Sequence, residues 1–396
     1  MTNKLIDKYM NKRLVWVDYD NRGLETKVNK SLIISAVGGG RGQVIEKEER
    51  PPKHYYREIN IMRGILALLV ILGHVLTQLN ATTTWDYLIF NGIGQVIYSF
   101  HMPAFFAVSG FVSIKAIHCD ALMMKMDFIL NKFKRLMIPY FIMGVLYLPF
   151  RIFLSKFARN EFSLSEFPLI FVGHNPDGAL WFLYILFILA LITCIISTKR
   201  NIYVITTLAF LLFVFAATGH AFVPEYKGCS SVLINVFAVL GKVETFLFFY
   251  VGGICLRLNY DRIYKILKDY SATILFFSIV LFIIGNVLRT GLGMNVGYII
   301  TTLSGITMVW EIALITVGKE ESHTSRWLNR MGDYSMDLYI LGEPFKVALR
   351  TVLSILPLAL MVPFTFILTV AVSIAASFYF VRRIKVLKVL LLGDKQ

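Results

Sequence analysis

Residues 271–288 read SATILFFSIVLFIIGNVL, a run without a charged side chain or a proline. An α-helix needs about 20 apolar residues to cross the hydrocarbon core of a bilayer. Comparable runs occupy residues 59–79, 181–197 and 202–218. These runs are too long for the core strands or core helices of a soluble domain. We therefore predict a chain that crosses a membrane several times.

The composition agrees with this prediction. The 396-residue chain is 57% hydrophobic and only 16% charged, whereas soluble domains carry about 25% charged residues. The net charge of +15 is what Lys and Arg clustered in cytoplasmic loops would produce, so we expect no nucleic-acid partner. The four cysteines lack C-x-x-C spacing, which indicates neither a metal site nor a disulfide framework.

The predicted fold is an all-α, polytopic membrane helix bundle with about ten transmembrane helices. The expected spans are 59–79, 88–114, 136–155, 179–197, 202–219, 232–256, 271–288, 296–317, 332–350 and 357–381. An even number of spans places both termini on one side of the membrane. Most Lys and Arg residues of the short loops share the side of the N-terminus. Because basic loops stay in the cytoplasm, we expect both termini to be cytoplasmic.

Three regions follow from this pattern. Residues 1–56 form a cytoplasmic tail of unknown role, without the apolar segment of a signal peptide. Its glycine-rich run at 38–42 is interpreted as a flexible linker rather than an anion site. Residues 57–383 form the membrane domain, and residues 384–396 a short cytoplasmic tail. Within the membrane domain, the basic, amphipathic stretch 119–137 is expected along the inner leaflet.

Ionisable side chains at membrane depth are the candidate functional residues, because each costs about 2.5 kcal/mol or more there. The candidates are Arg63, His74, His101, Lys242, Glu244, Glu311, Asp333, Asp337 and Glu343.

Arg63 and His74 form the most informative pair. They are eleven residues apart, so they lie on one helical face, roughly 16 Å apart along the axis. A cation near the inner surface suits an anionic group, and a deeper imidazole suits proton transfer. The alternative has Arg63 reaching the lipid head groups and His74 bonded to a carbonyl, and spacing alone favours this alternative. The functional hypothesis places both side chains in one polar cavity.

His101 lies in a second cluster, SFHMPAFFAVSG at residues 99–110. Pro103 removes a backbone donor, which kinks the helix or frees a carbonyl. Ser109 and Gly110 allow a close helix approach. His101 is therefore either a site residue beside irregular backbone or part of an ordinary helix–helix hydrogen bond.

Together, these residues resemble acyltransferase family 3, the ten-span membrane O-acyltransferases that modify cell-surface glycans. The stretches that carry the resemblance are REINIMRG at 57–64 continuing to Gly73 and His74, residues 99–110, RLMIPY at 135–140, LWFL at 180–183 and MGDYSMDLY at 331–339.

The resemblance implies roles for individual residues. Arg63 and His74 would be essential for acyl transfer, with His101 among the catalytic residues. Arg63 and Arg135 would bind the anionic part of a cytoplasmic acyl-CoA, usually acetyl-CoA. His74 would act as a general base on the acceptor hydroxyl or as a relay for the acyl group. No tightly bound cofactor and no metal are implied.

The chain departs from the family pattern at two places. Asn60 stands three residues before Arg63, where many members have Asp. The motif after Tyr339 continues through Gly342 and Glu343, where many members have His. A role of that His is therefore lost or has passed to Glu343.

We expect a multi-pass enzyme of the cell membrane, surrounded by membrane lipids, that transfers acetyl or succinyl from acyl-CoA to a hydroxyl of a cell-surface or lipid-linked glycan. One alternative is a polysaccharide or lipid-glycan exporter with the same membrane shell. Another is an ion-coupled transporter that relays protons through Lys242, Glu244 and Glu311. The sequence does not predict the oligomeric state.

Overall fold

The computed structural model describes residues 56–76, 86–119, 121–153, 164–219, 230–318 and 322–393. Every regular element in these ranges is a helix, which confirms the all-α prediction. The chain divides into two compact units at Tyr56 and Arg57, and all described elements belong to the second unit. The predictions for the N-terminal tail, including its glycine-rich run, lie outside the described residues.

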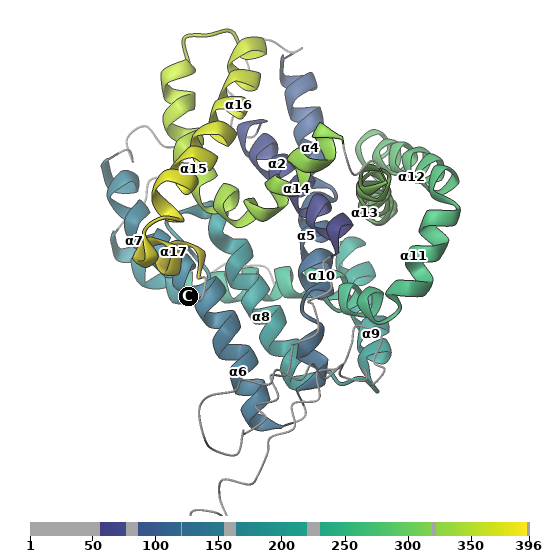
Figure 1. Cartoon of the computed structure of the whole chain (residues 1–396). Coiled ribbons are helices and arrows are strands. Elements are labelled where there is room, and N and C mark those ends of the chain that lie inside the picture. Colours follow the sequence, from purple (N-terminus) through teal and green to yellow (C-terminus); the bar gives the residue numbers. More distant parts are fainter. Residues whose placement is uncertain are drawn as a thin grey trace, which may run out of the picture. The chain divides into compact units, whose positions relative to one another are not determined.

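The helices follow one another along the chain (Figure 1). They are α2 (Arg57–Leu76), η1 (Tyr87–Asn91), α4 (Gly92–Tyr98), α5 (His101–Phe111), η2 (Ile114–His118), α6 (Leu122–Lys132), η3 (Phe133–Met137), α7 (Ile138–Phe153), η5 (Leu164–Val172), η6 (Gly178–Leu180), α8 (Trp181–Ile196), α9 (Ile202–Ala217), α10 (Ser231–Leu258), α11 (Tyr260–Asp269), α12 (Ser271–Asn286), η7 (Val287–Gly291), α13 (Asn295–Val317), α14 (His323–Asp333), α15 (Ser335–Leu353), α16 (Leu358–Ala376), η8 (Ser377–Val381) and α17 (Lys385–Leu392).

Six of the described helical segments are long and apolar enough to cross a membrane. They are Arg57–Leu76, Gly178–Ile196, Ser231–Leu258, Ser271–Gly291, Asn295–Val317 and Leu358–Val381. Each coincides with a predicted span to within a few residues, because an apolar run ends where polar loop residues begin. These six segments support an integral membrane protein.

The other four predicted spans are shorter or interrupted. The segment 88–114 is divided between α4 and α5, and 136–155 corresponds to α7. The segment 202–219 corresponds to the short apolar helix α9. The segment 332–350 starts at the end of α14 and continues as α15. The count of ten and the cytoplasmic position of the termini therefore stay predictions.

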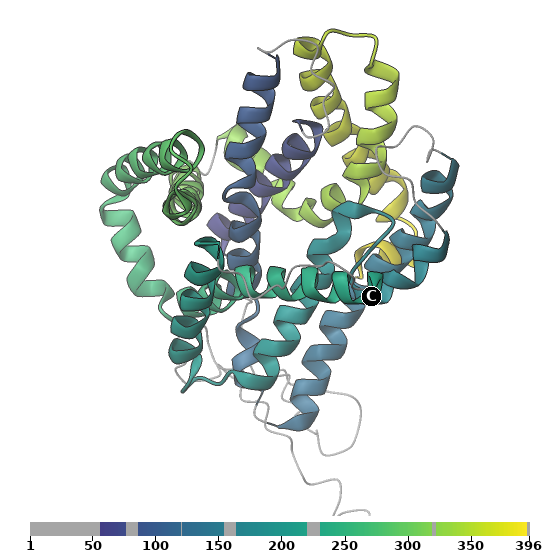
Figure 2. The ribbon, with the colours of Figure 1, turned by 180° about the vertical axis from the view of Figure 1, so that it is seen from behind.

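Helix α2 is the most enclosed of the six. It packs against α4, α5, α13, α14, α15 and α16, and 67% of its apolar window is buried. In contrast, only 11% of the window in Ser271–Gly291 is buried, although α12 packs closely along α13. Figures 1 and 2 show α12 and α13 side by side from opposite directions. Candidate residues on α2 are thus inside the bundle, whereas most of α12 is available to lipid.

The break between α4 and α5 has a local cause. Phe100 leaves the helical conformation, with φ −138° and ψ −25°, and Pro103 lies in the first turn of α5. Pro103 has no N–H to donate to the carbonyl of Ser99. That carbonyl instead accepts a hydrogen bond of 2.8 Å from Thr302 Oγ1 on α13. The prediction that Pro103 frees a carbonyl is confirmed.

The close contact predicted at Gly110 is also present. A Cβ atom on Gly110 would lie 1.8 Å from the carbonyl oxygen of Tyr250, and one on Gly253 would lie 2.0 Å from that of Ala107. Glycine on both sides lets the backbones of α5 and α10 touch.

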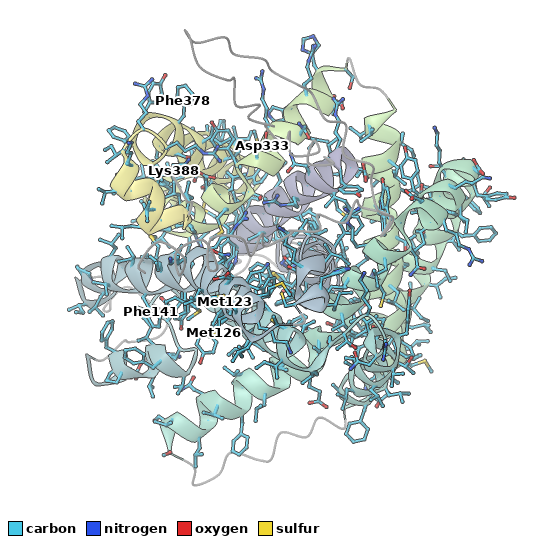
Figure 3. All side chains as sticks on the ribbon, turned by 60° about the horizontal axis from the view of Figure 1, so that its bottom comes forward. Met123, Met126, Phe141, Asp333, Phe378 and Lys388 are labelled. Carbon is cyan, nitrogen blue, oxygen red and sulfur yellow. The ribbon has the colours of Figure 1, made fainter. Side chains whose placement is uncertain are left out.

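The basic stretch 119–137 contains the amphipathic helix α6, which is largely exposed. Its apolar side chains include Met123 and Met126, which are 78% and 54% exposed (Figure 3). Lys132 at its end donates a hydrogen bond of 2.7 Å to Ser113, and burial, followed by the charge of Arg135, lowers the pKa of Lys132 to about 8. This pattern suits a helix at a membrane surface, and its place on the inner leaflet stays a prediction.

Candidate functional site

A cavity lies where α2, the start of α8 and α15 meet. Its lining residues are Val70, Ile71, His74, Ala179, Leu338, Tyr339, Gly342, Glu343 and Lys346. The space not filled by protein atoms is about 260 Å³, including the part open to the outside. Most of the lining is apolar, while the polar side chains come from His74 and from one face of α15.

Three ionisable side chains meet at this cavity. His74 Nδ1 lies 3.7 Å from Glu343 Oε2, and Lys346 Nζ donates a hydrogen bond of 2.7 Å to Glu343 Oε1. His74 is 27% exposed, Glu343 15% and Lys346 2%. Glu343 therefore stands between two nitrogen groups, with one carboxylate oxygen directed to each. The 3.7 Å separation is an ion-pair distance and longer than a hydrogen bond.

The segment before α8 closes one side of the cavity. The side chain of the buried Asp177 accepts a hydrogen bond of 3.0 Å from the Ala179 amide, and the Asp177 amide donates one of 2.9 Å to Asn175. Asn175 in turn donates 2.8 Å to the carbonyl of Tyr140 on α7. Tyr339 of α15 donates a hydrogen bond to the carbonyl of Ala179. These contacts tie the segment before α8 to α7 and α15.

His101 is near His74 but does not line the cavity. Its ring lies 4.9 Å from the ring of Tyr98, and the Tyr98 ring lies 6.3 Å from that of His74, both edge to face. His101 Nδ1 is 2.7 Å from the carbonyl oxygen of Ile97, and the residue is 1% exposed. This hydrogen bond is a local one, to the carbonyl four residues earlier at the end of α4, and the site role of His101 stays a prediction.

Arg63 and His74 both face α15, as their spacing predicts. Arg63 donates a hydrogen bond of 2.9 Å to Ser335 at the start of α15, while His74 approaches Glu343 further along the same helix. However, Arg63 is not among the residues of the cavity. Ala67 of α2 and Leu338 of α15 belong to a buried apolar core. This core lies between the contact of Arg63 with Ser335 and the contact of His74 with Glu343. The expectation that both side chains line one cavity is wrong in this respect.

Asn60 and Asp333 form part of the contact between α2 and α14. Asn60 Nδ2 lies 2.9 Å from Asp333 Oδ1 and also donates to the carbonyl and side-chain oxygens of Asn329. Asp333 is an exposed residue at the end of α14 (Figure 3). The position where many relatives have Asp is thus used here to donate to a carboxylate.

Asp337 belongs to a separate ion pair. It is 1% exposed and accepts hydrogen bonds of 3.0 and 2.8 Å from Arg382, as well as one from Ser377. These hydrogen bonds raise the pKa of Arg382, whose guanidinium lies 4.0 Å from the ring centre of Tyr334. Asp337 thus anchors α15 to the segment after α16, away from the cavity.

The remaining candidates are dispersed. Glu311 is fully buried and accepts a hydrogen bond of 2.7 Å from Ser271. Lys242 lies 5.4 Å from the ring centre of Trp181, and Glu244 is buried on the same helix. Arg135 is exposed in η3. The structure brings none of these four to the cavity lining.

Lys346 and Tyr339 are cavity residues that the sequence analysis did not select as candidates. The signal for Lys346 was available, because it follows Glu343 by three residues in a predicted span and such residues share a helical face. Tyr339 offers no comparable signal, since a tyrosine in a membrane helix is most often a packing or interface residue.

The arrangement can support proton transfer in a water-poor space. It holds an imidazole, a carboxylate and an ammonium group in contact, within an enclosed part of a membrane protein. No group of three or more His, Cys, Asp or Glu side chains that would hold a metal ion occurs in the described ranges.

One of three comparisons with known proteins identifies the family of the chain. No curated protein and no solved structure matches the chain. Residues 56–381 match the family described as an acyltransferase domain, and this range holds all of α2 to η8 with the cavity between them. The chain belongs to acyltransferase family 3 and is a membrane acyltransferase.

Proposed function

We propose that the protein is an O-acyltransferase that moves an acetyl or similar short acyl group from cytoplasmic acyl-CoA to a hydroxyl of a cell-surface or lipid-linked glycan. The single observation that carries this proposal is the imidazole of His74, held at a largely apolar cavity with its Nδ1 atom 3.7 Å from Glu343. A sugar hydroxyl is a weak nucleophile, and a positioned base accelerates its attack by about 10²–10⁴-fold.

In the proposed reaction, the hydroxyl oxygen attacks the thioester carbonyl carbon while His74 accepts the hydroxyl proton. The carbon–sulfur bond then breaks, and the imidazolium returns the proton to the leaving thiolate. The products are the ester and free coenzyme A. The apolar walls of the cavity exclude water, which limits hydrolysis of the thioester.

Arg63 is proposed to bind an anionic group of the donor. It lies near the start of α2, beside the start of α15, whereas His74 lies near the end of α2. The apolar core around Ala67 and Leu338 lies between Arg63 and the cavity. A donor whose thioester lies at Arg63 therefore reaches His74 only if α2 and α15 separate at this core. At His74 the acyl group passes either directly to the hydroxyl or first to the imidazole, which releases coenzyme A and then gives up the acyl group to the hydroxyl; acid-quenched labelling of the protein distinguishes the two routes.

The test uses purified full-length protein in lipid nanodiscs with radiolabelled acetyl-CoA and a panel of envelope glycans. His74→Ala is expected to lower turnover by about 10²–10⁴-fold. Arg63→Ala is expected to raise the KM for acetyl-CoA by roughly tenfold or more, as for loss of a charge-assisted contact. Succinyl-CoA in the same assay tests the choice of donor.

Two exposed residues provide matched controls. His323→Ala on α14 and Arg262→Ala on α11 remove the same side-chain types at exposed positions, and both should retain wild-type kinetics. If wild-type protein releases no more coenzyme A than His74→Ala with any glycan, the enzyme proposal fails and the exporter alternative gains support.

A further inference from the structure

Glu343 and Lys346 form an ion pair that is almost fully enclosed, in a segment predicted to lie in the membrane. A lone carboxylate or ammonium group there is expensive, and buried charges are normally paired. The 2.7 Å contact between Lys346 Nζ and Glu343 Oε1 supplies that pairing. The two residues are three apart on α15, so one helical face carries both groups to the cavity.

The second oxygen of Glu343 faces His74. Its Oε2 atom lies 3.7 Å from His74 Nδ1, Lys346 lines the same cavity, and the ring of Tyr98 lies 6.3 Å from the imidazole. A carboxylate next to one ring nitrogen of a histidine fixes the orientation of the ring and leaves the opposite nitrogen for chemistry.

We propose that Glu343 and Lys346 act as a positioning pair for His74, in which Glu343 orients the imidazole through Nδ1 and Lys346 keeps Glu343 ionised and fixed. This inference rests on the proposed acyl transfer. It assigns neither residue to the reacting atoms: Nε2 of His74 exchanges the proton, and Glu343 and Lys346 keep their charges throughout. The 3.7 Å gap is expected to shorten when substrate fills the cavity, since such contacts often tighten in the complex.

The residue that precedes the pair on α15 also belongs to the cavity. Gly342 itself lines the cavity and lies against Ile71 of α2. A Cβ atom at 342 would lie 3.4 Å from the Ile71 side chain, an ordinary van der Waals contact, so α15 lies close to α2 next to Glu343 and His74.

The test is a double-mutant cycle in nanodiscs, with kcat and KM measured separately. Glu343→Gln leaves Lys346 as an unpaired buried charge, and Lys346→Met does the same to Glu343. Each single variant is expected to lower kcat by about 10–100-fold, as for groups that orient a catalytic residue, with little change in KM. The double variant Glu343→Gln/Lys346→Met is expected to be more active than either single variant, because it strands no charge and its amide oxygen still faces Nδ1.

Thermal unfolding shows whether each single variant folds. If one does not, conservative variants provide a second test. Lys346→Arg keeps the charge and should retain kcat within a few-fold, as should the exposed control pair Asp261→Asn/Lys265→Met on α11. Glu343→Asp is one methylene shorter, which widens the gap to His74, and should lower kcat.

Two outcomes would overturn the positioning pair while leaving acyl transfer intact. One is a double variant whose loss equals the product of the two single losses, since independent effects indicate no coupling. The other is wild-type kcat in Glu343→Gln. Absence of turnover in the wild-type protein is a different result, and it would contradict the proposed function itself.

Discussion

At the scale of the residue, Asn60 shows how one atom type decides a contact. Its Nδ2 atom is 2.9 Å from a carboxylate oxygen of Asp333 and also donates to the carbonyl of Asn329. The Asp333 carboxylate and the Asn329 carbonyl can only accept, so a donor suits the position between them. The buried amide of Asn60 is therefore suited to this position, and a carboxylate is not.

The change Asn60→Asp is predicted to destabilise the protein although it restores the residue found in many relatives. The new carboxylate would face the carboxylate of Asp333 and the carbonyl of Asn329, both acceptors, a loss of about 1–3 kcal/mol. Thermal unfolding in nanodiscs measures this loss. The exchanged variant Asn60→Asp/Asp333→Asn restores one donor and one acceptor and should recover much of the stability. A midpoint unchanged by Asn60→Asp would contradict the hydrogen bonding described here.

At the scale of the element, α15 carries two carboxylates with different partners. Asp337 pairs with Arg382 beyond α16, whereas Glu343, six residues later, pairs with Lys346 and faces α2. One helix is thus anchored on one side and contributes to the cavity on the other. An anchored helix holds its side chains more accurately than a loop, which suits a residue that orients a base.

The crossing of α5 and α10 provides a prediction with an internal control. A Cβ atom on Gly253 would lie 2.0 Å from the carbonyl oxygen of Ala107, while one on the adjacent Gly252 meets nothing within 4 Å. Gly253→Ala should therefore cost about 1–3 kcal/mol from overpacking. Gly252→Ala should be neutral or slightly stabilising, because Ala is the better helix former. Unfolding of the two variants side by side checks this, and equal midpoints would show that the helices do not touch there.

At the scale of the whole described unit, hydrogen bonds bring residues of the predicted cytoplasmic loops together at the start of α2. Tyr260 on α11 donates a hydrogen bond of 2.6 Å to Glu58, and Arg57 donates one of 3.2 Å to Ser325 on α14. Both contacts lie at the start of α2, and His74 lies near its other end. This arrangement agrees with a cytoplasmic start of α2, and labelling from the two sides of the membrane can establish it.

Two exposed positions test the topology directly. Gly178→Cys precedes α8 and Lys268→Cys follows α10, in a protein whose native cysteines have been replaced. Three predicted spans separate them, so an impermeant maleimide should label residue 178 in intact cells and residue 268 only after permeabilisation. Labelling of both residues from the same side of the membrane would show that the short helix α9 does not cross the membrane. The reverse pattern would invert the orientation.

The sequence predicts what depends on neighbours in the chain and misses what depends on packing. Apolar runs predict the long helices to within a few residues, and the spacing of Arg63 and His74 predicts their common face. Their partners, Ser335 and Glu343, lie more than 260 positions away, and no periodicity within one helix predicts them. For the same reason, the separation of Arg63 from the cavity could not be anticipated, because it results from Leu338 packing near Ala67.

The contact between His101 and Ile97 has one more consequence. A ring nitrogen 2.7 Å from a carbonyl oxygen must carry hydrogen, since two acceptors would repel each other. The neutral ring therefore exists as a single tautomer, with its lone pair on Nε2. Nδ1 is occupied by the backbone, so any proton that His101 gains or gives up must pass through Nε2 alone.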